Sequence, residues 1–91
     1  MISKEYTISN PSGLHARPAS RLVQTAQKFK SNIALEGNGK TINVKSMIKL
    51  LSGGITKGSS VTITCDGEDE EESMAAITEL FDNDFYEGTE T

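Results

Sequence analysis

The chain has 91 residues and a net charge of −4, a size that suits one small domain, residues 1–91, with a single modest core. No apolar run is long enough to cross a membrane, and the first residues lack the apolar stretch of a secretory signal, so we expect a cytoplasmic protein without membrane insertion. One cysteine excludes an internal disulfide, and one cysteine with one histidine excludes the usual Cys/His zinc site, so we expect no metal.

The first third of the chain predicts a strand followed by a helix. Residues 2–8 alternate and place their apolar side chains on one side, as in a strand. Residues 10–13 form a dense turn signal. Apolar residues then recur at helical spacing, which predicts an amphipathic helix that ends near Lys30. Its apolar face comprises Ala19, Leu22, Val23, Ala26 and Phe29.

The middle third predicts a hairpin and a short helix. Two short strands flank the Gly-Asn-Gly sequence at 37–39, which is a strong hairpin signal. Ser46 suits the N-cap of a short helix that residues 52–54 would close. The strands carry Ile33, Leu35, Ile42 and Val44, and the helix carries Met47, Ile48, Leu50 and Leu51.

The last third predicts a strand and a helix. Val61, Ile63 and Cys65 alternate along the strand. Residues 68–72 are all acidic, which favours a helix start because negative charge interacts well with the positive end of the helix dipole. Residues 86–91 are typical of a frayed polar tail. We expect the helix to bury Met74, Ile77 and either Leu80 or Phe81.

The predicted order is strand, helix, strand, strand, helix, strand, helix, which indicates an α+β fold. A sheet with one apolar face needs a cover, and the two longer helices can provide it. Propensity alone does not choose the order of the strands in the sheet.

Residues 13–18, Gly-Leu-His-Ala-Arg-Pro, contain the only histidine, His15, where the first helix would begin. Free N–H groups and the positive end of the dipole favour an anion at that point. Arg17 can donate two parallel hydrogen bonds to a phosphate. A neutral imidazole beside a phosphate seat suggests a histidine that is itself phosphorylated. Taken without its neighbours, His15 would be read as a polar or structural loop residue.

Several types of catalyst are excluded by what the chain lacks. Without a second histidine it cannot use one as nucleophile and another as acid, and without a P-loop we expect no bound nucleotide and no cofactor. A carrier needs only one nucleophile and a docking surface, because its partners supply the remaining groups. The residues therefore favour a phosphoryl carrier over an autonomous enzyme.

Residues 13–19 resemble the phosphorylation-site motif of the HPr family, the histidine phosphocarriers of the bacterial sugar phosphotransferase system. Residues 43–48 resemble the regulatory-serine segment of many Gram-positive members, and the resemblance covers nearly the whole chain. It implies an open-faced β-sandwich, in which three helices cover one side of a four-stranded antiparallel sheet. It also implies a monomer in which His15 accepts phosphate on Nδ1, Arg17 stabilises that phosphate, and Ser46 is phosphorylated.

The resemblance further implies the partners. Enzyme I, charged by phosphoenolpyruvate, would phosphorylate His15, and sugar-specific Enzyme IIA would receive the phosphate. HPr kinase/phosphorylase and a catabolite-control transcription factor would act through Ser46. The alternative is a mainly regulatory module of the same fold, acting through Ser46 on a transcription factor or metabolic enzyme. A third hypothesis is an unrelated small ligand-binding domain, in which the His-Ala-Arg-Pro sequence would be a coincidence.

The short helix suggests a docking surface. It cannot bury all its apolar residues, so we expect an exposed patch of Met47, Ile48 and Leu51, rimmed by Arg21 and Lys49. The alternative is that the three apolar residues belong to the core. Lys49 stands where the family often has glycine.

Charge is unevenly distributed along the chain. All nine Lys and Arg precede Cys65, and eleven of the thirteen acidic residues follow it. A basic face around Arg17, Arg21, Lys45 and Lys49 would attract acidic partners, the alternative being an ordinary mixed surface. We expect no direct binding of nucleic acid, because aromatic residues are scarce.

Overall fold

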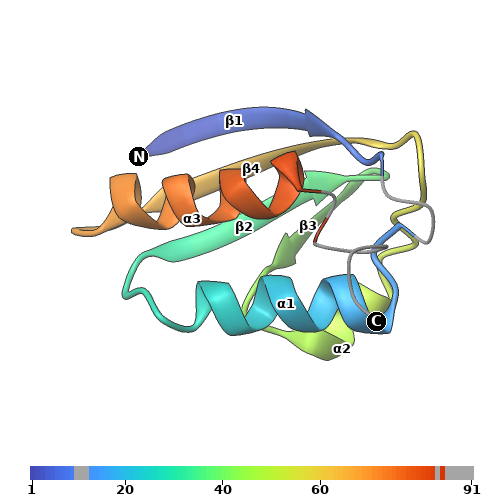
Figure 1. The fold of residues 1–91 in the computed structure, drawn as a ribbon, viewed down its shortest axis with the longest axis horizontal. Coiled ribbons are helices and arrows are strands. Elements are labelled where there is room, and N and C mark those ends of the chain that lie inside the picture. The colour runs from blue at the N-terminus through green and yellow to red at the C-terminus, as the bar shows by residue number, and fades with distance from the viewer. Residues whose placement is uncertain (10–12, 84, 86–91) are drawn as a thin grey trace.

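The computed structural model describes residues 1–9, 13–83 and 85 (Figure 1). The elements are β1 (Ile2–Thr7), α1 (Ala16–Ala26), β2 (Asn32–Gly37), β3 (Lys40–Asn43), α2 (Met47–Leu51), β4 (Ser60–Asp66) and α3 (Glu70–Asp82). The predicted order is confirmed. Most of the turn predicted at 10–13 and the whole tail predicted at 86–91 lie outside the described residues.

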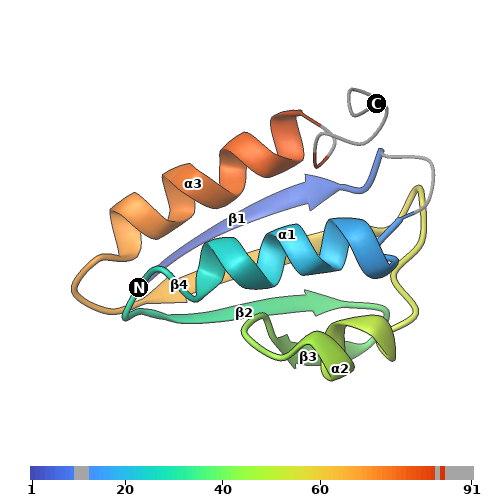
Figure 2. The ribbon, with the colours of Figure 1, turned by 60° about the horizontal axis from the view of Figure 1, so that its bottom comes forward.

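The four strands form one antiparallel sheet in the order β1-β4-β2-β3. Figure 2 shows the helices on one side of it, with α1 between α3 and α2. α1 contacts both of the other helices, while α3 also contacts β1 and β4 and α2 contacts β3. The expected open-faced sandwich is therefore confirmed, and its strand order is now known.

The core lies between the sheet and the helices. Strand β4 contributes Val61, Ile63 and Cys65, all buried, as their alternation predicts. Helix α3 buries both Leu80 and Phe81, where one of the two was expected. The Phe81 ring stacks on Tyr6 of β1, with 4.2 Å between ring centroids. The buried face of α1 comprises Pro18, Ala19, Leu22, Val23 and Ala26.

Helix α1 ends at Ala26, four residues before the predicted end near Lys30. The N–H groups of Lys28 and Phe29 bond carbonyls only three residues back, which tightens the chain into a turn. Two other segments hold this turn. The Lys45 ammonium donates to the Phe29 carbonyl at 2.8 Å, and the Asp69 carboxylate accepts the Lys30 N–H at 2.8 Å. Tertiary contacts therefore end the helix.

Asp69 stands at the N-cap of α3, yet its side chain makes no cap bond to that helix. Its carboxylate accepts hydrogen bonds from the Ser31 hydroxyl, the Lys30 N–H and the Ser31 N–H. These bonds, led by that of the Ser31 hydroxyl, hold the pKa of Asp69 below its usual range. The start of α3 is thereby tied to the turn that leads from α1 into β2.

The hydrogen bonds to the Asp69 carboxylate, which we call the Asp69 clasp, predict that the stability of the fold depends on pH. Because the pKa of Asp69 is lower in the folded chain than in the unfolded chain, its contribution is present at neutral pH and is lost as pH falls below about 4. We expect the free energy of unfolding, measured in urea across that range, to fall less steeply for Asp69→Asn than for wild type. The matched control is Asp82→Asn, which changes an exposed carboxylate at the other end of α3. Equal slopes for wild type and Asp69→Asn would contradict the assignment.

Candidate functional site

His15 occupies the N-cap position of α1 and is exposed. Its carbonyl accepts the first hydrogen bond of the helix, from the Ala19 N–H at 2.9 Å. Its imidazole makes no capping bond, so the ring is not used to start the helix. N–H groups in the first turn of a helix have no acceptor within that helix, and together with the dipole they favour an anion beside them. The exposed imidazole therefore lies beside a position that favours an anion.

The first turn of α1 combines a rigid residue with a charged one. Pro18 is buried and is the third residue of α1. A backbone N–H in the first turn has no acceptor within the helix, so the missing N–H of proline costs little there. Arg17 is exposed and helps to line a shallow hollow of about 490 Å³ on the outer surface of α1. A guanidinium at this position can supplement the helix N–H groups in holding phosphate oxygens.

The loop before β4 supports the start of α1. Leu14 is buried and its N–H donates to the Ile55 carbonyl at 3.1 Å. Gly13 has a φ of +62°, and a Cβ there would lie 2.8 Å from both the Ile55 oxygen and the Thr56 Cα. Such a separation is shorter than van der Waals contact, so only glycine permits this approach. Sequence reasoning did not assign a role to Ile55 or Thr56. The one sequence signal for this contact is the glycine at position 13.

Helix α2 forms as predicted. Ser46 is its N-cap, and the Ser46 hydroxyl accepts the Lys49 N–H at 3.4 Å. Leu50 is fully buried and Met47 packs half-buried against the core. Ile48 and Leu51 remain 79% and 45% exposed, so α2 presents apolar surface to solvent. The apolar residues thus divide between core and surface.

The ends of α2 lie at different distances from His15. Figure 2 shows α1 and α2 running in opposite directions, with the end of α2 and the loop after it at the start of α1. Leu51 therefore lies toward the end of the molecule that carries His15. Ser46 lies toward the other end of α1, since the Lys45 ammonium next to it bonds the Phe29 carbonyl.

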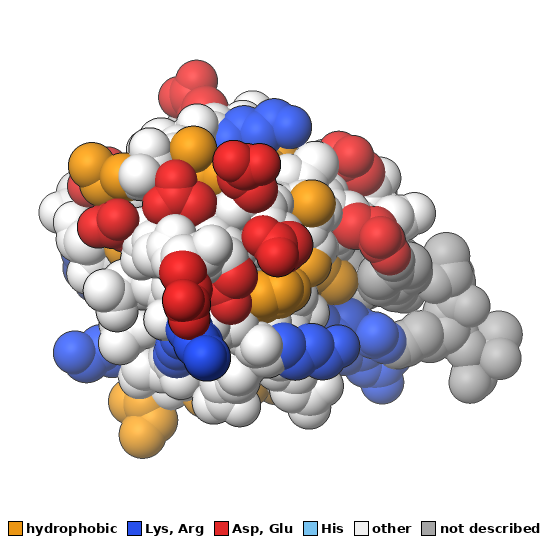
Figure 3. All heavy atoms as spheres, turned by 90° about the vertical axis from the view of Figure 1, so that its left-hand side faces the viewer, with side chains coloured by type: hydrophobic (Ala, Val, Ile, Leu, Met, Phe, Trp, Pro, Cys, Tyr) orange, Lys and Arg blue, Asp and Glu red, His pale blue; other side chains and the backbone are white. Residues whose placement is uncertain are grey.

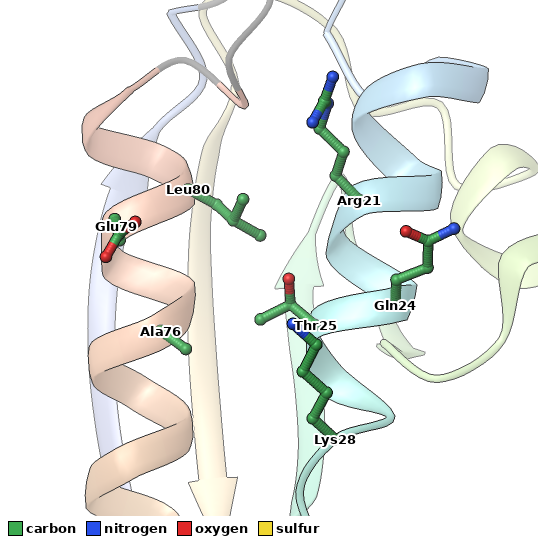
Figure 4. Close-up of a pocket in the computed structure, with 7 residues that line it drawn as sticks. All are labelled: Arg21, Gln24, Thr25, Lys28, Ala76, Glu79 and Leu80. Carbon is green, nitrogen blue, oxygen red and sulfur yellow. The ribbon is translucent and has the colours of Figure 1, made fainter.

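The basic residues divide between two hollows. Arg17 and Arg21 line the hollow on the outer surface of α1, whereas Lys45 and Lys49 line a hollow beside the uncovered face of the sheet. Arg21 also lines a groove of about 350 Å³ between α1 and α3, where Figure 4 shows its guanidinium pointing along α1 toward the start of that helix. Figure 3, at the end where α3 begins, shows acidic side chains gathered above a row of basic ones, with further basic atoms near the top.

Gly53 follows α2 and lies close against β3. A Cβ at position 53 would lie 2.5 Å from the Cδ1 atom of Ile42 on β3. Ile42 is buried. The isoleucine therefore occupies the space that a larger side chain at position 53 would need.

Other chemistry finds little support in the part of the chain that the structure describes. No group of three or more His, Cys, Asp and Glu residues there could hold a metal ion. None of its helices is long and apolar enough to span a bilayer. Cys65 is buried, and burial raises the pKa of its thiol, which makes it a poor nucleophile.

The chain resembles known proteins over nearly its whole length. Residues 2–83 match the family model described as the PTS HPr component phosphorylation site. The chain is 42% identical over 89 residues to the phosphocarrier protein HPr of Xylella fastidiosa, covering 98% of this chain and 100% of that one. It resembles the crystal structure of HPr-C-His from Thermoanaerobacter tengcongensis with a TM-score of 0.91 at 41% identity, covering 96% and 98%. It resembles Bacillus subtilis Crh, a catabolite-repression protein seen as a domain-swapped dimer, with a TM-score of 0.66 at 36% identity, covering 96% and 95%.

The contact between Gly53 and Ile42 predicts a coupled pair of substitutions. Gly53→Leu should lower the free energy of unfolding by about 1–3 kcal/mol, because it overfills the space beside Ile42. Ile42→Ala alone should cost about 2–5 kcal/mol through the cavity it leaves. The double variant should be less destabilised than the sum of the two by at least about 0.5 kcal/mol, as measured by urea denaturation. Additive costs would rule out steric competition between these residues.

Proposed function

The chain belongs to the HPr family of phosphocarriers of the bacterial sugar phosphotransferase system, and we propose that it carries a phosphoryl group on His15 from Enzyme I to sugar-specific Enzyme IIA. The observation that carries this proposal is the exposed imidazole of His15 at the N-cap of α1, without a capping bond. The role implies a cytoplasmic location and a monomer that exposes the start of α1 to each partner in turn.

The proposed transfer has two balanced steps. A neutral nitrogen of His15, Nδ1 by analogy with the family, attacks the phosphorus held on Enzyme I. A phosphorus–nitrogen bond forms, and the bond to the donor group breaks with its electron pair returning to Enzyme I. In the second step a nucleophile of Enzyme IIA attacks the same phosphorus, and the electron pair returns to His15. The helix N–H groups and Arg17 balance the charge on the phosphoryl oxygens in both steps.

Two features support α2 as part of the docking surface. Ile48 and Leu51 expose apolar area next to α1, and such exposed area on a small protein favours partner binding. Arg21 and Lys49 add positive charge on either side of the two helices, which favours acidic partners. Met47 contributes less, because it is half-buried against the core.

Ser46 is proposed as a regulatory phosphorylation site. Among the described residues its hydroxyl accepts one long hydrogen bond, from the Lys49 N–H, so a kinase can displace it at little cost. HPr kinase/phosphorylase would be the modifying enzyme, and a catabolite-control transcription factor could recognise the product. A mainly regulatory role is the second candidate, favoured by the likeness to Crh. The exposed His15 favours the carrier role as the principal one.

The first test compares His15→Ala with wild type, each incubated with phosphoenolpyruvate and Enzyme I. Because His15 is exposed and caps nothing, the variant should keep the circular dichroism spectrum and unfolding midpoint of wild type while taking up no phosphate. Arg17→Ala should still be phosphorylated, about 10- to 100-fold more slowly, since one charge-assisted contact is lost. Acid-labile phosphate on His15→Ala would show that His15 is not the acceptor.

The second test introduces a negative charge at the start of α2. Ser46→Asp should leave the fold intact, because an acidic side chain suits a helix N-cap. It should slow phosphorylation of His15 by Enzyme I, because the added charge lies next to Ile48 and repels an acidic partner. Ser3→Asp is the matched control, since it adds the same charge to an exposed residue of β1. Equal rates for Ser46→Asp and wild type would leave Ser46 as a cap alone.

A further inference from the structure

The tip of the β2–β3 hairpin reaches the loop that follows α2. Asn38 and Gly39 form a two-residue turn with φ values of 53° and 73°, as an Asn-Gly hairpin turn requires. The Asn38 side chain also makes a hydrogen bond outside the turn. Its Nδ2 donates to the Gly53 carbonyl at 3.1 Å, across 15 positions of sequence.

Further contacts reinforce this attachment. A Cβ at Gly54, which has a φ of +71°, would lie 3.0 Å from the same Asn38 Nδ2. The Cδ1 atom of Ile55 would lie 3.2 Å from a Cβ at Gly37, just before the turn. The Lys40 ammonium donates to the Ser52 carbonyl at 3.4 Å. The hairpin tip therefore touches residues 52–55 at successive positions.

The other side of this loop holds the start of α1. The Ile55 carbonyl accepts the Leu14 N–H, and Gly13 lies directly against Ile55 and Thr56. Leu14 immediately precedes His15. A continuous set of contacts thus runs from Asn38 through Gly53 and Ile55 to the residue next to the imidazole.

We propose that Asn38 is a positioning residue for phosphoryl transfer, acting on His15 through the loop 53–56. The inference rests on the proposed carrier function of His15. Transfer demands that the ring nitrogen approach phosphorus within a narrow range of distance and direction. A loop released from the hairpin tip lets Leu14 move and broadens the range of His15 orientations. The transfer step then slows, while the docking surface on α1 and α2 stays unchanged.

Asn38→Gly separates the two roles of this residue. Glycine adopts a φ of +53° readily, so the turn conformation stays accessible while the side chain that bonds the Gly53 carbonyl is removed. Gly39→Asn is the matched control. Asparagine also tolerates a positive φ, and a Cβ at position 39 meets nothing within 4 Å, so the control alters the same turn without touching the loop.

The first measurement is amide hydrogen exchange on the unphosphorylated chain. In Asn38→Gly the Leu14 N–H should exchange about 3- to 10-fold faster than in wild type, because the Ile55 carbonyl is less firmly held. The Ile63 N–H, in the central strand β4, reports global opening and should change less than the Leu14 N–H. Unchanged Leu14 exchange, or equal acceleration at Leu14 and Ile63, would overturn the proposal.

The second measurement is the rate of phosphorylation by Enzyme I as the concentration of the chain is varied. Asn38→Gly should lower kcat at least about twofold with KM unchanged, whereas Gly39→Asn should match wild type. Because Asn38 is exposed, it could instead touch Enzyme I directly; a raised KM with unchanged kcat would show that and overturn the positioning role. Failure of wild type to accept phosphate would refute the carrier function itself. If wild type is phosphorylated and Asn38→Gly is phosphorylated equally fast, only the role of Asn38 is refuted.

Discussion

The arrangement of the site depends on one backbone hydrogen bond, from the Leu14 N–H to the Ile55 carbonyl. This bond, with the close approach of Gly13, fixes where α1 begins and therefore where His15 stands. The other end of α1 is held by different contacts, from Lys45 to Phe29 and through the Asp69 clasp. A helix anchored at both ends can expose a side chain and still keep its position well defined. That is what a carrier needs when it must fit two partners in turn.

The sheet supports the three helices from one side. Its covered face buries the apolar sides of all three helices, and its other face is left open. The exposed apolar residues Ile48 and Leu51 lie on the helical side, next to α1. The short α2 cannot bury both faces, so Leu50 enters the core and its neighbours stay outside. Exposed apolar area is thus a direct consequence of helix length.

Much of the fold follows from sequence because local signals and tertiary packing agree. The alternation along β4, the Asn-Gly turn and the Ser46 cap all occur as predicted. What sequence alone missed depends on contacts distant along the chain. Helix α1 stops early because Lys45 and Asp69 bind the turn after it, and no local pattern reveals that. The support from Ile55 and the filling of space by Ile42 are likewise visible only in three dimensions.

The proposed carrier role requires that a single histidine at the start of α1 receives the phosphoryl group. The decisive measurement is the intact mass of the wild-type chain after incubation with phosphoenolpyruvate and a catalytic amount of Enzyme I. We expect a gain of one phosphoryl group that is lost in acid and survives base, as is typical of a phosphorus–nitrogen bond. No gain in mass, or a group that survives acid, as a serine ester does, would contradict it.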